Sequence, residues 1–172
     1  MRIIAGSLKG RRFEAPRGSA TRPSSDFVRE TAFNLVGPVE GAQVCDLYAG
    51  SGGLGLEALS RGAARCLFVD SSAPACAAIR TNLERLGLEG TVVRRDAVAA
   101  LRAVSGSFDL VLCDPPYELD PTAALAPELV RVLAPAGLVL YQSRARVEPV
   151  LEGLDVTTSR RYGSARLTLF TH

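Results

Sequence analysis

The chain has 172 residues, of which 47% are hydrophobic and 22% charged, and its formal net charge is +2 at pH 7. This length predicts one domain, residues 1–172, and the composition is that of an ordinary globular protein rather than a disordered or fibrous one. No apolar run approaches the ~20 residues that span a bilayer, and the first residues lack the apolar core of a signal peptide. We therefore expect a cytoplasmic protein with no membrane partner.

The charges are unevenly distributed along the chain. Residues 1–30 carry seven basic residues against three acidic ones, residues 31–141 carry eight against twelve, and residues 142–172 carry five against three. Basic flanks around an acidic centre suit a polyanionic partner such as nucleic acid. Genome composition is the alternative explanation, since Lys9 is the only lysine.

The first elements are a basic extension and a helix. Two short β-prone pieces within residues 1–15 flank Gly6–Gly10, which predicts a β-hairpin, and a turn-rich linker follows. Residues 1–20 would thus precede a core at residues 21–172. Ser24 or Ser25 can cap a helix that ends near Val36. The basic side chains of the hairpin, which could contact phosphates without reading bases, are Arg2, Lys9, Arg11 and Arg12.

Strands and helices then alternate. Strands are expected at residues 43–48, 65–70, 91–95, 108–113 and 137–142, and helices at residues 54–61, 73–86, 97–104 and 121–133. Near-continuous apolar strands indicate an α/β fold with a doubly wound, mostly parallel sheet that is covered on both faces. At the end we expect a short helix at 147–151 and an antiparallel hairpin formed by 154–161 and 166–171.

The most informative turn follows the first strand of this sheet. Gly50-Ser51-Gly52-Gly53-Leu54-Gly55 fits the pattern G-x-G-x-x-G. Its glycines permit positive φ and close approach of a ligand, and the next helix directs its first N–H groups at that ligand. A glycine-rich structural turn is the alternative. Because no G-K-[ST] follows, hydrolysis of a nucleoside triphosphate is disfavoured.

Four aspartates, Asp46, Asp70, Asp96 and Asp114, stand at the ends of expected strands, where ligands collect in parallel sheets. Asp70 lies twenty residues after Gly50, the spacing at which a carboxylate accepts the hydroxyls of a ribose. Asp96-Ala97 could meet an adenine edge or simply cap a helix. Asp46 could balance a cationic group of the ligand.

The reaction must proceed without histidine, because His172 is the only one. The cysteines Cys45, Cys66, Cys76 and Cys113 are far apart, so we expect no zinc site, and those in strands should be buried free thiols. Methyl transfer from a sulfonium fits, since the enzyme mainly aligns donor and acceptor.

The acceptor side of such a reaction is predicted at Asp114-Pro115-Pro116-Tyr117. The Asp114 carboxylate and the Pro115 carbonyl can accept hydrogen bonds from an exocyclic amine. Tyr117 can stack on a base that has left its helix. A rigid turn after the strand is the alternative reading.

In this order, these motifs resemble the class I S-adenosylmethionine-dependent methyltransferases that modify exocyclic amines. More narrowly, the whole chain resembles the bacterial 16S ribosomal RNA guanine-N2 methyltransferases. The matching stretches are Met1–Gly6, Arg22–Asp26 with Arg29-Glu30, Leu47–Gly62, Asp114–Tyr117 and Tyr162-Gly163.

The resemblance implies a Rossmann-like, seven-stranded sheet and methylation of guanine N2 without a metal. The acceptor motif would be catalytic, and Arg22 and Arg29 would join the RNA-binding residues. The partner would be 16S rRNA, naked or in an assembling small subunit, and we expect a monomer. The residues that would line S-adenosylmethionine are Asp46, Tyr48, Ala49, Gly50, Ser51, Gly52, Asp70, Ser71, Asp96 and Ala97.

Two positions depart from the family pattern: Phe27 stands where a basic residue is frequent, and Gln142-Ser143 where an acid is common. Two alternative functions remain open at this point. The acceptor could be an adenine N6 or a protein amide, since the tetrapeptide tolerates either. The glycine pattern alone also permits an NAD-binding or non-catalytic module.

Overall fold

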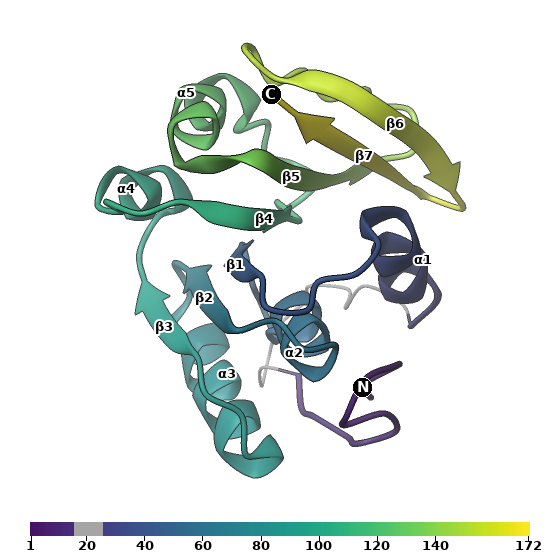
Figure 1. The fold of residues 1–172 in the computed structure, drawn as a ribbon, viewed down its shortest axis with the longest axis vertical. Helices are drawn as coiled ribbons and strands as arrows, with labels where there is room; N and C mark the ends of the chain where they lie inside the picture. The colour runs from purple at the N-terminus through teal and green to yellow at the C-terminus, as the bar shows by residue number, and fades with distance from the viewer. Residues whose placement is uncertain (16–25) are drawn as a thin grey trace.

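A computed structural model gives positions for residues 1–15 and 26–172 (Figure 1). Its centre is a seven-stranded sheet in the order β3-β2-β1-β4-β5-β7-β6. The strands are β1 Gln43–Leu47, β2 Arg65–Asp70, β3 Thr91–Arg94, β4 Phe108–Cys113, β5 Leu133–Arg144, β6 Asp155–Tyr162 and β7 Ala165–Thr171.

The pairing of the strands is parallel from β3 through β5, whereas β7 runs antiparallel to both β5 and β6. This confirms the predicted doubly wound, mostly parallel sheet with an antiparallel C-terminal hairpin. The classical dinucleotide-binding sheet has the order 3-2-1-4-5-6. Here the reversed strand β7 lies between β5 and β6, which separates this fold from that one.

Helices cover both faces of the sheet. They are α1 Asp26–Val36, α2 Gly53–Ser60, α3 Ala73–Leu86, α4 Ala97–Arg102 and α5 Thr122–Val132. One apolar cluster joins α1, α2 and α3 to the sheet, and a second joins α4 and α5 to its other face. Because neighbouring strand residues face these two clusters alternately, the central strands have apolar residues at nearly every position.

Local signals explain why α3 has the expected bounds. The Ser72 hydroxyl accepts a hydrogen bond from Ala75 N at 3.3 Å, and Gly87 ends the helix with a φ of +65°. A serine cap and a glycine in the left-handed region satisfy the backbone groups that a helix leaves unpaired at its two ends.

Residues 1–15, which we call the N-terminal ribbon, fold back on themselves in the antiparallel arrangement of the predicted hairpin. One bridge joins Arg2 to Arg12, and Ile3 N donates to Arg11 O at 2.9 Å. The ribbon also bonds to α2, because Ile4 N and Ala5 N donate to the Glu57 carboxylate at 2.8 and 2.9 Å. Figure 1 shows the ribbon lying beside α2.

Two expectations are corrected. Residues 147–151 form no helix, because Pro149 disfavours the helical conformation at Glu148 and Val147 N already closes a turn on Arg144 O at 2.9 Å. Strand β5 begins at Leu133 rather than at 137. A bulge makes this possible, since β5 advances from Leu133 to Leu138 while β4 advances from Phe108 to Leu110.

Some earlier predictions fall outside the described residues, namely the helix cap at Ser24 or Ser25 and the phosphate contact of Arg22. Within the described part of the chain, no helix has the length and apolarity that a membrane crossing requires.

Candidate active site

The site predicted from the sequence lies at the carboxyl edge of the parallel strands. Strands β1 and β4 are neighbours in the sheet, but the helix after β1 packs on one face and the helix after β4 on the other. The chain connections therefore diverge between these strands, which is the kind of point at which open α/β sheets bind their ligands. The glycine loop follows β1, and Asp114-Pro115-Pro116-Tyr117 follows β4.

The glycine loop has an unusual backbone. Tyr48, Gly50 and Gly52 have φ values of +58°, +56° and +80°. For Tyr48, which is half-buried, such a conformation costs about 1–3 kcal/mol. A Cβ atom built on Gly50 would meet only Tyr48 O, at 3.9 Å, and so would project into open space above the loop. This is the space through which a ligand can approach the backbone.

The other glycines of the loop serve packing. A Cβ on Gly52 would lie 3.2 Å from Ile79, and one on Gly55 would lie 2.3 Å from Phe68 and 2.7 Å from the Cys66 sulfur. Gly55 therefore allows α2 to pack closely against β2, which is the role of the third glycine in a dinucleotide fingerprint.

Asp70 joins the glycine loop to the end of β2. One carboxylate oxygen accepts from Gly50 N and the other from Ser72 N, each at 2.8 Å. A carboxylate has about four lone-pair sites, so Asp70 retains acceptor capacity for ribose hydroxyls while it holds the loop. Ser71, beside it, is exposed, and its carbonyl accepts from Arg94 Nε at 3.3 Å.

Asp46 holds the glycine loop from beneath. Its side chain is 1% exposed and accepts a hydrogen bond from Gly55 N at 2.8 Å. Burial raises the pKa of this carboxyl well above its usual value, and the charges of Asp114 and Asp70 raise it further. Asp46 thus supports the loop, and its contact with the donor stays a prediction.

Asp96 occupies the end of β3 and caps α4, where its carboxylate accepts from Ala99 N at 3.0 Å. The residue is exposed, whereas the adjacent Ala97 is buried. The charge of Asp96 also acts on the Tyr48 hydroxyl, whose pKa is raised by burial and then by the charges of Cys113 and Asp96. Capping and a ligand contact are compatible here, because only one carboxylate oxygen serves the cap.

The acceptor motif turns the chain away from the end of β4. Asp114 is half-buried, Pro115 is buried, and Tyr117 is 39% exposed. Leu119 N donates to Pro116 O at 2.9 Å and closes the turn. Beside it lies a hollow of about 300 Å³, which is lined by Pro115, Pro116, Tyr117, Glu118, Leu119, Asp120, Thr122, Tyr141, Gln142, Ser143, Arg144, Val147, Glu148, Pro149 and Val150.

The departure at Gln142-Ser143 falls in the wall of this hollow. Both side chains are 7% exposed, and the Ser143 hydroxyl donates to Val147 O at 2.9 Å. At the mouth, the Arg144 guanidinium lies 5.5 Å from the centre of the Tyr117 ring and 3.2 Å from the Glu118 carboxylate. The hollow thus has a flat aromatic wall and a cation at its rim.

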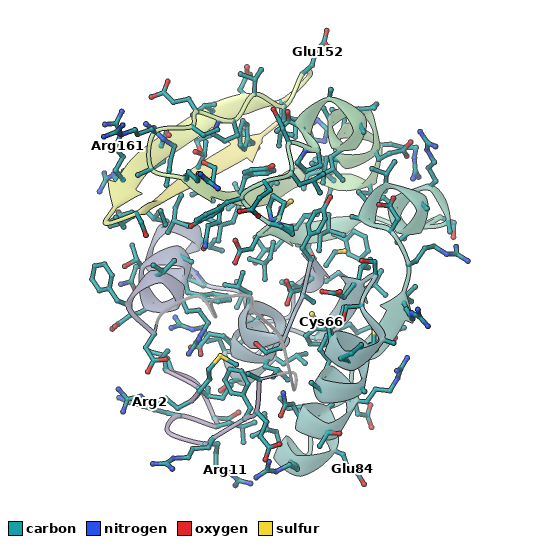
Figure 2. All side chains as sticks on the ribbon, turned by 180° about the vertical axis from the view of Figure 1, so that it is seen from behind. Arg2, Arg11, Cys66, Glu84, Glu152 and Arg161 are labelled. Carbon is teal, nitrogen blue, oxygen red and sulfur yellow. The ribbon has the colours of Figure 1, made fainter. Side chains whose placement is uncertain are left out.

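The predicted RNA-binding residues divide into two groups. Lys9, Arg11 and Arg12 are exposed, as is Arg2, which pairs with Asp26 at 2.9 Å. Figure 2 shows Arg2 and Arg11 at the surface of the N-terminal ribbon.

Arg29 is corrected, because its side chain is 1% exposed. It donates to Arg2 O at 2.7 Å and to the Asp26 carboxylate at 2.8 Å, and it lies over the Phe13 ring. It braces the N-terminal ribbon rather than offering a cation to a phosphate.

Sequence reasoning missed two buried polar residues. Glu57 on α2 and Asn82 on α3 have no exposed surface. Asn82 Nδ2 donates to Glu14 O and Ser51 O at 2.9 and 3.1 Å, so that it connects the ribbon to the glycine loop. A signal was present at Glu57, because it is a lone acid among apolar residues on a short helix.

The groups excluded from the chemistry lie as expected. All four cysteines are free and buried, which confirms the prediction for those in strands, and burial raises the pKa of Cys45, Cys66 and Cys113. His172 follows β7 and its ring contacts Leu133 O at 3.2 Å, at the edge of the sheet opposite the site.

The strand order, with its reversed β7, and the glycine loop after β1 define a class I methyltransferase. The comparisons with known proteins then give the particular family. A family described as "Conserved hypothetical protein 95" matches residues 1–171, and the chain belongs to this family.

Relatives of known name agree with this assignment. The chain is 38% identical to "Putative rRNA methyltransferase YlbH" of Bacillus subtilis (strain 168), over 99% of this chain and 98% of that one. It is 34% identical to "Ribosomal RNA small subunit methyltransferase D" of Escherichia coli (strain K12), over 88% of this chain and 76% of that one. A solved structure, "Putative methyltransferase yhhF from Escherichia coli", superposes with a TM-score of 0.86 at 30% identity, covering 99% of this chain and 96% of that one.

Proposed function

We propose that this protein transfers a methyl group from S-adenosylmethionine to the exocyclic N2 amine of a guanine in small-subunit (16S) rRNA. One observation carries the proposal: Pro115, Pro116 and Tyr117, which directly follow Asp114, line the hollow at the end of β4, and β4 pairs with the strand that leads into the glycine loop. The names of the relatives support an rRNA substrate. The choice of guanine N2 rests on the resemblance of the motifs.

The residues around the glycine loop fit the donor. Gly50 leaves the space above the loop open, and the half-buried Asp70 can accept the ribose hydroxyls. Asp96-Ala97 follows β3, one strand farther along the same edge of the sheet, and would meet the adenine. When bound, the donor supplies an electrophilic methyl group, which needs no metal and no histidine for activation.

The acceptor motif supplies orientation. The Asp114 carboxylate and the Pro115 carbonyl would accept the two N–H bonds of the amine and thereby turn its lone pair toward the methyl group. Tyr117 would stack on the guanine, a contact worth ~1–3 kcal/mol. As the nitrogen–carbon bond forms, the carbon–sulfur bond of the donor would break with its electron pair left on sulfur, and the amine would lose one proton to the adjacent Asp114. Alignment of this kind accounts for a large share of a barrier reduction.

The test is Asp114→Ala with labelled donor and small-subunit rRNA from cells that lack this gene. We expect transfer to fall by at least a thousandfold, roughly the 10²–10⁴ range of a proton-transfer group with orientation lost as well, while donor affinity stays within about twofold. Digestion of the wild-type product to nucleosides should give N2-methylguanosine. N6-methyladenosine, or label in protein, would establish a different acceptor, and weakened donor binding in the variant would misplace Asp114.

A further inference from the structure

Strand register connects the acceptor hollow to a surface that the proposed reaction does not use. Arg144 is opposite Ala165 in the β5–β7 pair, and Ala165 is opposite Tyr162 in the β6–β7 pair. Side chains that are directly opposite project from the same face of a sheet. At 4.7–4.9 Å per strand, Tyr162 lies about 10 Å from Arg144 along this row. The C-terminal end of β6 thus belongs to the catalytic edge of the sheet.

The row ends in an aromatic pair. The rings of Tyr162 and Phe27 meet edge to face with their centres 6.3 Å apart. Phe27 is the second residue of α1 and is 62% exposed, while Tyr162 is half-buried against the core cluster. An exposed ring held at a fixed angle by a partly buried one offers a rigid flat face to a ligand, with little side-chain entropy left to lose.

Basic residues lie along this face of the sheet and beside the start of α1. Arg160 lies two residues before Tyr162 on the same face of β6 and is exposed. Arg144 lies at the other end of the row, and Arg2 pairs with Asp26, the neighbour of Phe27. Figure 2 shows Arg161 on the β6–β7 hairpin and Arg2 on the N-terminal ribbon, with α1 between them on one side of the molecule. Exposed ion pairs such as Arg2–Asp26 are worth only ~0–1 kcal/mol, so a phosphate can compete for the guanidinium.

We propose that Phe27 and Tyr162 form a stacking site for an unpaired nucleotide that flanks the target base, with Arg144 contacting a phosphate between the two positions and Arg160 a phosphate beyond the stacked nucleotide. Aromatic faces beside cations are the common means of holding single-stranded nucleic acid. The site rests on the proposed function, because it presumes that an RNA strand enters the acceptor hollow. It also gives Phe27 a purpose at a position where a basic residue is frequent in the family.

The chain contains no tryptophan, so Phe27→Trp introduces a single fluorescent reporter at the site. We expect short single-stranded polyadenylate to quench its emission saturably, because stacking is tolerant of base identity. A polyadenylate–polyuridylate duplex, whose bases are paired, should quench it little. The matched control is Val156→Trp, which places the reporter at the other end of β6, where Val156 is 54% exposed.

Kinetics supply the second measurement. Phe27→Ala should raise KM for small-subunit rRNA by roughly 5- to 150-fold, the equivalent of one stacked base, and leave donor affinity unchanged. The stacking site would be overturned if Phe27→Trp binds fluorescently labelled polyadenylate without any quenching of its tryptophan. A KM of Phe27→Ala within about twofold of the wild-type KM would overturn it as well. If polyadenylate quenches Phe27→Trp but the wild-type protein leaves rRNA unmethylated, the nucleotide site stands and the proposed function is overturned.

Discussion

Glu57→Gln is the sharpest test of how the N-terminal ribbon is held. The Glu57 side chain has no exposed surface. One of its oxygens accepts from Ala5 N and Arg61 Nε, each at 2.9 Å, and the other accepts from Ile4 N at 2.8 Å. Glutamine keeps the size and shape of the side chain, but it replaces one acceptor with an NH₂ group and removes the charge.

The magnitude follows from counting these bonds. The amide would keep its oxygen toward the two donors and turn its NH₂ toward Ile4 N, which leaves a buried donor unsatisfied at a cost of about 1–3 kcal/mol. The bond from Ala5 N changes from charge-assisted to neutral and loses about 1 kcal/mol, because the charged form is roughly twice as strong. Arg61 keeps a hydrogen bond but loses its ion pair with the carboxylate, which is worth up to about 1 kcal/mol. The total is about 2–5 kcal/mol, a large part of a typical stability of about 5–15 kcal/mol.

Urea unfolding followed by circular dichroism measures this loss, and hydrogen exchange shows where it acts. We expect faster exchange of the amides of Ile4 and Ala5 in particular. Glu84→Gln, at an exposed position on α3 (Figure 2), is the control and should stay within about 0.5 kcal/mol of wild type. A loss below about 1 kcal/mol for Glu57→Gln would mean that the carboxylate does not fix the ribbon.

Three further predictions concern the loop and the ribbon. Gly50→Val should lower donor affinity at least tenfold in calorimetric titration at a folding cost of only about 1–2 kcal/mol, and unchanged affinity would disprove the open approach above the loop. Asp46→Asn should raise the free energy of unfolding most at neutral pH, because it removes a carboxyl whose burial disfavours the charged form. The pKa of Asp46 is higher in the folded state than in the unfolded state, so the stability gained by the variant should shrink as the pH falls toward the unfolded-state pKa of about 3.9. A gain that grows on acidification would refute the raised pKa. Alanine at both Arg11 and Arg12 should weaken RNA binding and flatten its salt dependence by about 1.4 in log–log slope, whereas an unaltered slope would show that neither contacts phosphate.

The sequence was sufficient for the sheet and most helices because their signals are local. Strands β2 and β4 and helix α3 have the expected bounds, since apolar runs, a serine cap and a terminal glycine act within a few residues. The reversed β7 was also predictable from the turn at Tyr162-Gly163-Ser164. The strand order and the register of β5 were not, because they depend on pairing between distant segments and on a bulge.

The misplaced residues share one physical cause, which is that burial depends on tertiary packing. Arg29 looked like a surface cation on a helix, but the ribbon folds over it and its guanidinium bonds to Arg2 O. The hairpin of residues 1–15 was predictable, but periodicity cannot show that the partner of Ile4 N is Glu57, far along the chain. Pro149, by contrast, was a local warning against a helix at 147–151.

The aspartates at the strand ends were ambiguous in the sequence because a backbone cap and a ligand contact use the same residue type. The structure shows that three of them hold the backbone: Asp46 binds Gly55 N, Asp70 binds Gly50 N and Ser72 N, and Asp96 binds Ala99 N. Asp46 and Asp70 thereby fix a loop whose positive φ angles would otherwise be costly. A donor then meets a loop that is already in its binding shape, so that little of its binding energy is lost to ordering the protein. For Asp70 and Asp96, holding the backbone is therefore no argument against contact with a ligand, since it keeps the remaining lone pairs in place.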